Sequence, residues 1–386
     1  MKILSRLIGS VVMFTALLIP HHLYAAPGNP ADWVVGTQTF QSNYPLGFEF
    51  TATITSSAGE ITRARIIWTH APGSGTQRSR PAEIDPKTGA LYAVWEATSA
   101  DAVPPWVGVT YYWDVTDTEG NSYQTDPQYA EYEDTSREWV RTESDDVIVF
   151  AESLPEEVGP MTADAMAEQR ETYRAAWGGL LPYKPRAILF GDRVAWLEWQ
   201  GVTASNILGT TRDDWGATVQ IVSGGNLEDL AYGTVLHEIA HIYQTEFSLM
   251  GGVSWFNEGN ATFFELYQSY DYEGRVRQLA AENKLLPLLR DSGPSIRGDH
   301  GRDGYDIGYT FWKWFTANYG LDGHRQLIEL LDTGITRTSA LEQITGLALD
   351  EIESRWRVWI GASAQVPTLI PTETLFFFPT LTPFGQ

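Results

Sequence analysis

The stretch "TVLHEIAHIY", Thr234 to Tyr243, decides how the rest of the chain is interpreted. His237 and His241 are four residues apart, so on a helix they lie about 40° apart around the axis and project from one face. Glu238 lies about 100° around the helix from His237, where its carboxylate can reach a metal-bound water without being a ligand. This spacing predicts a zinc hydrolase site with two imidazole ligands and a base that takes a proton from water.

The residues that flank this motif are uncharged. Val235, Leu236, Ile239, Ala240 and Ile242 favour a helix that is buried around the site. An ordinary amphipathic helix that carries two histidines is the alternative interpretation. A catalytic zinc ion has three protein ligands and one open position. Because the chain contains no cysteine, the third ligand must be a histidine, an aspartate or a glutamate.

Candidates for the third ligand follow in "SWFNEGNATFFE", residues 254–265. Glu258 comes 17 residues after His241, inside the next predicted helix. Two antiparallel helices joined by a short turn that contains glycine would bring this carboxylate back to the metal. Glu265 lies on nearly the same face of that helix and is the rival candidate; otherwise it is an outer partner of a ligand or a surface carboxylate.

These two motifs carry a resemblance to a known family. "HEIAH" (237–241) followed by "WFNEGNA" (255–261) resembles the gluzincin clan of zinc metallopeptidases, in particular the peptidase MA-like domains. The resemblance covers roughly residues 145–361 and implies a thermolysin-like fold with a small mixed sheet beside a helical half. It implies one Zn²⁺ per chain held by His237, His241 and Glu258, with Glu238 as general base and a peptide or protein as substrate.

Two further features qualify that resemblance. The chain has no Gly-x-Met-Glu-Asn segment, the substrate-anchoring strand of the related aminopeptidases, so aminopeptidase specificity is not implied. A tyrosine or histidine often supports the oxyanion of amide hydrolysis. The stretch 303–320, "DGYDIGYTFWKWFTANYG", resembles the later helix of the family, and this resemblance favours Tyr305 for the role. Tyr309, one turn on, and the loop residue His300 are the alternatives.

The N-terminal part of the chain, residues 26–140, is predicted to be an all-β domain. Side chains alternate between apolar and polar in "GFEFTATIT" (47–55), "ITRARIIWT" (61–69) and "GVTYYWDVTD" (108–117), as in half-buried strands. Turn sequences such as "SSAG" and "DPKTG" separate the strands. The pattern predicts a sandwich that is immunoglobulin- or fibronectin-like in outline.

An acidic segment, residues 132–146, marks the predicted boundary with the second domain, residues 145–361. Strands are expected in 145–151, 185–192 and 217–225. Helices are expected in 162–180, 226–252, 254–270, 275–289, 307–320, 323–334 and 349–361. Thr162, Asn226 and Ser254 are the predicted caps of the first three.

The two ends of the chain differ from these domains. Residues 1–25 combine a positive start, an apolar core over 7–20 and a plausible cleavage site before Ala26, which predicts a signal peptide and an exported protein. Residues 362–386 are rich in proline and threonine and predict an extended tail. No other stretch is apolar for long enough to span a bilayer, so no stable membrane insertion is expected after cleavage.

Composition narrows the possible partners. Lysine and arginine number 26 against 49 aspartates and glutamates, for a net charge of −23 in 386 residues. Such a field repels phosphate backbones and anionic lipids, which argues against nucleic acid as a partner.

Together, the two zinc-site motifs and the predicted signal peptide make an exported zinc metallopeptidase the favoured hypothesis. A binding or adhesion protein that uses the sandwich beside an inactive zinc domain is the alternative, and hydrolysis of a non-peptide amide or ester is a third possibility.

Overall fold

The computed structural model describes residues 31–70, 76–98, 102–200, 209–222, 226–248, 254–289, 293–297 and 301–366. The predicted signal peptide, residues 367–386 of the predicted tail and His300 lie outside the described residues.

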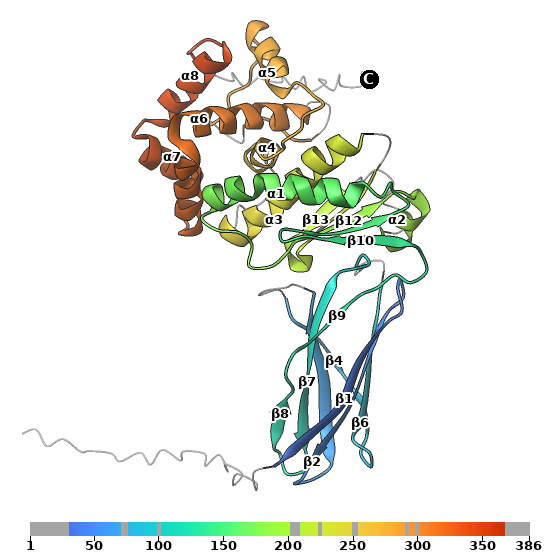
Figure 1. The fold of residues 1–386 in the computed structure, drawn as a ribbon. Coiled ribbons are helices and arrows are strands. Elements are labelled where there is room, and N and C mark those ends of the chain that lie inside the picture. Colours follow the sequence, from blue (N-terminus) through green and yellow to red (C-terminus); the bar gives the residue numbers. More distant parts are fainter. Residues whose placement is uncertain are drawn as a thin grey trace, which may run out of the picture.

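The N-terminal domain is a sandwich of two antiparallel sheets (Figure 1). The first sheet has the order β1-β2-β6-β5 and the second β4-β3-β7-β8, with β9 also paired to β7. Their bounds are β1 Trp33–Ser42, β2 Gly47–Ser56, β3 Ile61–Thr69, β4 Arg78–Pro81, β5 Glu83–Asp85, β6 Ala90–Glu96, β7 Gly108–Asp117, β8 Ser122–Gln124 and β9 Gln128–Glu131. The three strands predicted from alternation are β2, β3 and β7, and each buries the predicted apolar face.

Aromatic side chains fill the space between the two sheets. Phe48 and Phe50 of β2, Trp68 of β3, Trp95 of β6 and Trp113 of β7 are all buried with at most 1% of their surface exposed. Large rings bury much apolar surface per residue, so this small sandwich needs no disulfide to form a core.

A third sheet begins the second domain and has the order β10-β11-β12-β14-β13. The three central strands are parallel and fully buried, and the two edge strands run antiparallel to them. The bounds are β10 Trp139–Glu143, β11 Ile148–Glu152, β12 Arg186–Phe190, β13 Gly209–Arg212 and β14 Ala217–Ile221. The predicted strands 145–151, 185–192 and 217–225 correspond to β11, β12 and β14.

The second domain starts earlier than its predicted boundary. β10 lies inside the acidic segment that marks the predicted boundary, because "WVRTE" pairs with β11 as an edge strand and so tolerates charged side chains. The sandwich accordingly ends near Glu131, the last residue of β9, and not at 140.

The end of the sandwich lies against the third sheet (Figure 1). Phe150 of β11 stacks on Trp106 of the sandwich, with ring centroids 4.8 Å apart. Arg186 of β12 is buried here and forms an ion pair with Glu131, with 2.7 Å between Nη2 and Oε1. One hydrophobic core therefore runs from the sandwich to the underside of the third sheet.

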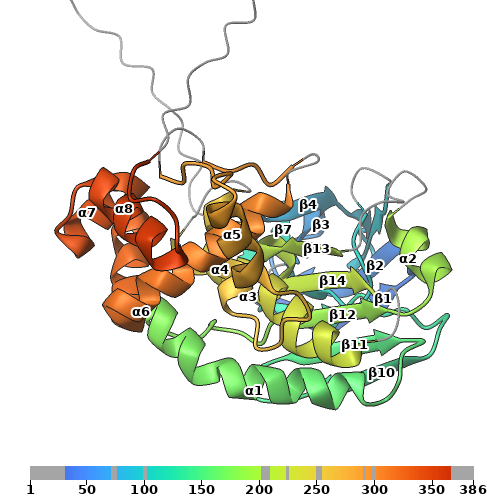
Figure 2. The same cartoon turned by 90° about the horizontal axis from the view of Figure 1, so that it is seen from above.

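Helices cover the opposite face of the third sheet and continue beyond it (Figures 1 and 2). α1 and α3 contact the sheet, and α4 to α8 form the helical half. The helices are α1 Val158–Trp177, α2 Arg193–Gln200, α3 Val235–Ser248, α4 Trp255–Phe263, α5 Tyr272–Ala281, α6 Arg302–Asp332, α7 Arg337–Thr345 and α8 Leu349–Ile360. None of the helices in the described ranges combines the length and apolar character needed to cross a membrane.

Several predicted helix bounds were wrong for identifiable reasons. α1 begins at Val158, so Thr162 is buried within it and is not its cap. The predicted helix 275–289 ends as α5 at Ala281, because Asn283 adopts the left-handed conformation with φ of 55° just beyond the C-cap residue Glu282. The predicted helices 307–320 and 323–334 are the two parts of α6, which starts earlier, at Arg302; they are separated, as predicted, by a kink at Gly320, whose φ of 69° suits glycine. α7 was not predicted.

α4 and α6 lie unusually close together, which places the helix with the candidate third ligand. A Cβ on Gly259 would overlap the backbone of Gly308, and a Cβ on Gly308 would overlap the carbonyl of Trp255. Trp312 of α6 donates its indole N–H to the carbonyl of Phe256 at 2.8 Å. The glycine in "NEG" thus lets α4 approach α6 and fixes the position of its neighbour Glu258.

Candidate metal centre

The helix with the two histidines begins in a π-helical turn. Asn226 accepts the amide of Glu228 at 3.1 Å, as predicted for a cap, and the chain then forms the π-helical turn Asp229–Thr234 ahead of α3. The carbonyl of Tyr232 accepts the amides of both Leu266 and Tyr267, at 2.8 and 3.1 Å. This turn therefore ties the chain that follows α4 to the start of α3.

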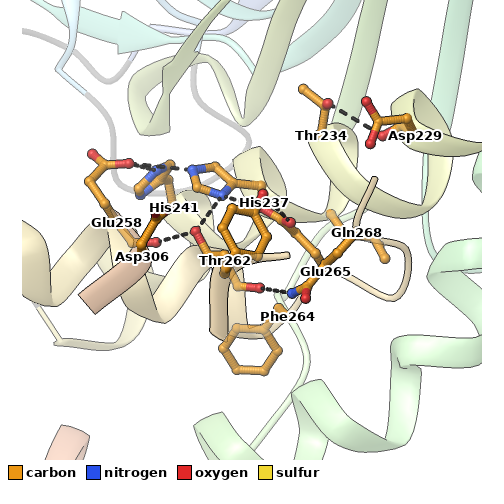
Figure 3. A network of polar contacts seen from close by, with 12 residues as sticks. Asp229, Thr234, His237, His241, Glu258, Thr262, Phe264, Glu265, Gln268 and Asp306 are labelled. Atoms are coloured by element: carbon orange, nitrogen blue, oxygen red, sulfur yellow. Dashed lines mark hydrogen bonds and ion pairs between the residues drawn. The ribbon is translucent and has the colours of Figure 1, made fainter. Parts of the chain in front are cut away.

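Three potential ligand atoms converge between α3 and α4 (Figure 3). Nε2 of His237 lies 3.3 Å and Nε2 of His241 lies 3.4 Å from the same carboxylate oxygen, Oε2 of Glu258. All three ligand atoms lie within 4.8 Å of one another. The structure thus brings together the three residues predicted as ligands, two from α3 and one from α4.

The other ring nitrogens of the two histidines are held by protein partners. Nδ1 of His237 lies 3.0 Å from Oε1 of Glu265, and Nδ1 of His241 lies 2.9 Å from Oε1 of Gln244. α4 ends at Phe263, so Glu265 is not on the helical face of Glu258 as predicted but reaches His237 from the chain beyond the helix. The rival ligand therefore lies on the Nδ1 side, away from the convergent atoms.

This arrangement fits zinc. Two imidazoles and one carboxylate are a donor set of catalytic zinc, and hydrogen-bonded outer partners fix the ring tautomers. With Nδ1 of each ring engaged by an acceptor, each Nε2 is left to donate to Glu258 when the ring is protonated or to offer its lone pair to a metal when the ring is neutral.

The partner of His241 belongs to a longer buried chain of hydrogen bonds. Nε2 of Gln244 donates to the Asn257 carbonyl at 2.8 Å and to Oδ1 of Asn260 at 3.1 Å. Nδ2 of Asn260 lies 2.8 Å from Nε2 of His324, whose Nδ1 lies 2.8 Å from the Ala176 carbonyl in α1.

Only one arrangement of protons satisfies this chain. A carbonyl cannot donate, so Nδ1 of His324 carries the proton and its Nε2 accepts from Asn260. Oδ1 of Asn260 then accepts from Gln244, and Oε1 of Gln244 accepts from Nδ1 of His241. Burial lowers the pKa of His324 to about 4, which keeps its ring neutral as the chain requires.

His237 lies between two carboxylates, those of Glu258 and Glu265. Burial by itself lowers the pKa of His237, but the hydrogen bonds to Glu258 and Glu265 outweigh this and raise it to about 10. Burial also opposes the charge on Glu258, but the hydrogen bonds from His237 and His241 hold its pKa well below the usual range. The site thus stabilises positive charge between two carboxylates, which is the property that a cation site requires.

The three convergent atoms face a cavity of about 610 Å³. Glu238 lines it, and Oε2 of Glu238 accepts the hydroxyl of Thr211 at 2.5 Å. Thr211 belongs to β13, the edge strand of the third sheet, and Gly209 and Thr210 of that strand also line the cavity. The predicted base therefore lies between the histidines and a strand edge.

Of the three predicted oxyanion donors, the structure places Tyr305 on the cavity. Its ring stacks on that of His237 with centroids 6.1 Å apart, and burial together with the charge on Glu258 raises its pKa, so the phenol stays protonated. Tyr309 lies instead beside Tyr272, with ring centroids 5.4 Å apart, and does not line this cavity.

Several residues of the site carried no recognisable signal in the sequence. Gln244 was not singled out, although it lies three residues after His241, whereas Glu265 was considered as the rival ligand. Thr211, Asn260 and His324 come from elements whose packing no local pattern specifies, so their contribution appears only in three dimensions.

Comparison with known proteins adds similar structures but no family. No known family and no curated protein matches the chain. Among solved structures, a two-domain M1 zinc metallopeptidase bound to L-arginine is 13% identical, with a TM-score of 0.38, over 87% of this chain and 96% of that one. An M1 zinc metallopeptidase from Deinococcus radiodurans is 15% identical, with a TM-score of 0.34, over 89% and 96%. An aminopeptidase N family protein from Idiomarina loihiensis is 10% identical, with a TM-score of 0.29, over 85% and 72%.

Proposed function

We propose that this protein is a zinc-dependent peptidase. The observation that carries the proposal is the convergence of Nε2 of His237, Nε2 of His241 and a carboxylate oxygen of Glu258 within 4.8 Å, beside a cavity that Glu238 also lines. These three side chains would hold the metal. Zinc in such a site makes water a stronger nucleophile at neutral pH and polarises a carbonyl oxygen.

Glu238 would move the proton. Its Oε2 accepts from Thr211, so we assign the transfer to Oε1, which takes the proton of the attacking water and passes it to the leaving amine. The Thr211 hydroxyl thereby orients the carboxylate.

Tyr305 would stabilise charge that develops on the carbonyl oxygen. Its phenol lines the cavity and stays protonated, so it can donate a hydrogen bond to an oxyanion. Since this bond strengthens as negative charge develops, it favours the transition state over the bound substrate.

The edge strand supports a peptide as the substrate. Among the residues that the structure describes, β13 is paired on one side only, with β14, and its residues 209–211 line the cavity. The free side of an edge strand offers backbone N–H and C=O groups to which an extended peptide can add. A simple ester or isolated amide would use none of these groups. Residues 1–25 carry the further proposal that the protein acts after export.

Metal content tests the proposal first. We expect about one zinc per chain in the purified protein and none in His241→Ala, measured by mass spectrometry of the metal. No zinc in the parent protein, even after zinc is added back, would refute the peptidase function.

Turnover tests the base separately. We expect Glu238→Gln to retain zinc and to hydrolyse a fluorogenic peptide library about 10²- to 10⁴-fold more slowly than the parent. Glu246→Gln, which removes a carboxylate from the same helix at a position that does not line the cavity, is the matched control and should cleave at the parent rate. Equal rates for parent and Glu238→Gln would show that Glu238 is not the base.

A further inference from the structure

Arg302, the first residue of α6, is the one lysine or arginine among the described residues that line the cavity. The nearby carboxylates have partners of their own: Glu258 faces the histidines, Glu265 bonds to His237, and Glu238 bonds to Thr211. A cation on this wall is unexpected in a chain of net charge −23 and serves none of the steps described above.

Aromatic rings fix the guanidinium in place. Its central carbon lies 4.6 Å from the ring centroid of Tyr270, 4.7 Å from that of Tyr272 and 5.8 Å from that of Tyr305. Nε donates to Oδ1 of Asp306 at 2.9 Å. A guanidinium held in this way loses little entropy on binding an anion, because its orientation is already set.

The charge of Arg302 is only partly balanced. Asp306 is buried and also accepts Nη1 of Arg275 at 3.0 Å. Although Arg275 has Asp303 as a second carboxylate, among the described residues the only ion pair of Arg302 is the one through Nε. Close to half of the Arg302 side chain, 46%, is exposed, so an anion in the cavity can reach the terminal nitrogens.

Arg302 also lies where two hollows meet. A second cavity of about 460 Å³ shares Thr234, Glu265, Tyr272 and Arg302 with the first. Figure 3 shows Thr234 and Glu265 on the side of His237 that faces away from Glu258. A substrate that extends from the metal centre along these hollows therefore passes the guanidinium.

We propose that Arg302 binds a carboxylate of the substrate close to the bond that is cleaved. The ring centroid of Tyr305 lies 5.8 Å from the guanidinium carbon and 6.1 Å from the ring centroid of His237, and an extended peptide advances about 3.4 Å per residue, so the carboxylate lies within about three residues of that bond. The carboxylate is either the C-terminus of the peptide or the side chain of an aspartate or glutamate. This inference rests on the proposed function, because it specifies the substrate of that site.

Binding to a protein that cannot turn over tests this inference apart from hydrolysis. Zinc-loaded Glu238→Gln is titrated with a set of hexapeptides that end in a free acid or an amide and that carry glutamate or glutamine at internal positions. We expect one acidic member of a pair to bind about tenfold to a hundredfold more tightly than its neutral match. The acid–amide pair reports the C-terminus, and the glutamate–glutamine pairs report a side chain.

Three further variants show whether Arg302 causes this preference for acidic peptides. Arg302→Gln should remove it, while Arg275→Gln, which takes a positive charge from the same Asp306 but does not line the cavity, should keep it. Arg302→Lys retains the positive charge but lacks the planar guanidinium, so it should keep part of the preference for acidic peptides. Equal binding of acidic and neutral peptides, no binding of any peptide, or a preference that persists in Arg302→Gln would overturn the inference. Failure of the parent protein to cleave any peptide would refute the proposed function instead.

Discussion

The two histidines of the candidate metal centre are supported in opposite ways. Nδ1 of His237 meets a carboxylate, Glu265, which also accepts the hydroxyl of Tyr272 at 3.0 Å. Nδ1 of His241 meets a neutral amide, Gln244, which leads through buried amides to His324. One side of the site supplies charge, and the other supplies a fixed neutral framework.

The difference follows from what surrounds each partner. Glu265 lies at the cavity, where Tyr272 and solvent share the cost of a buried charge. Gln244 and Asn260 are buried, with at most 3% of their surface exposed, and a charge there would have no counterion. Each arrangement fixes a histidine tautomer, but only the first also makes the imidazole more basic and so a stronger ligand.

The largest effect on stability should come from giving His241 a charged partner, as His237 already has. Gln244→Glu keeps an acceptor for Nδ1 of His241 but places a second carboxylate oxygen opposite two acceptors, the Asn257 carbonyl and Oδ1 of Asn260. Asn260 cannot turn to help unless His324 gains a proton. We expect a loss of about 3–5 kcal/mol in the free energy of unfolding, measured by chemical denaturation.

Gln326→Glu, at an exposed position of α6, is the control for this substitution and should change stability by less than about 0.5 kcal/mol. If the two variants were equally stable, the neutral framework would not depend on the absence of charge at Gln244.

The second prediction concerns the far end of the neutral framework. The pKa of His324 is about 4 in the folded protein and about 6.5 in an unfolded chain, so between these values the unfolded state binds more protons. Stability should therefore fall as the pH drops from 6.5 to 4, by about 3 kcal/mol from this residue. In the metal-free protein His237 contributes little in this range, because its folded pKa of about 10 and its unfolded pKa of about 6.5 both lie at or above it.

The contribution of His324 is measured by comparing unfolding at several pH values for the parent and His324→Asn. The variant retains an amide that can donate to the Ala176 carbonyl, but it does not titrate. Its stability should fall less steeply below pH 6.5. Parallel profiles for the two proteins would show that His324 is not the residue that makes the framework sensitive to acid.

The sequence predicted the parts of this site that depend on helical spacing. His237, His241 and Glu238 follow from one turn of one helix, and Glu258 follows from a second helix that had to return to the first. The alternation in β2, β3 and β7 predicted the buried face of the sandwich in the same way. These are local patterns, and the structure places their residues as the spacing requires.

What the sequence did not predict depends on contacts between distant elements. β13 is only four residues long and has no alternating apolar pattern, so the strand that carries Thr211 was missed. Glu265 was placed on a helix that ends two residues earlier, because the bonds to the Tyr232 carbonyl draw the chain away. His324 looked like one polar residue on a helix, and its role depends on α1, which ends 147 residues before it in the chain.

The smallest effect, a loss of zinc affinity, should come from giving His237 a neutral partner, as His241 already has. Glu265→Gln keeps an acceptor for Nδ1 of His237 but removes the charge, so we expect zinc affinity to fall about tenfold to a hundredfold, measured by competition with a chelator at pH 7. Tyr272→Phe removes one hydrogen bond to Glu265 but leaves the charge, and should weaken zinc binding by less than about tenfold. If Glu265→Gln bound zinc as tightly as the parent, the charge would be dispensable, and the two histidines would differ in their surroundings without differing as ligands.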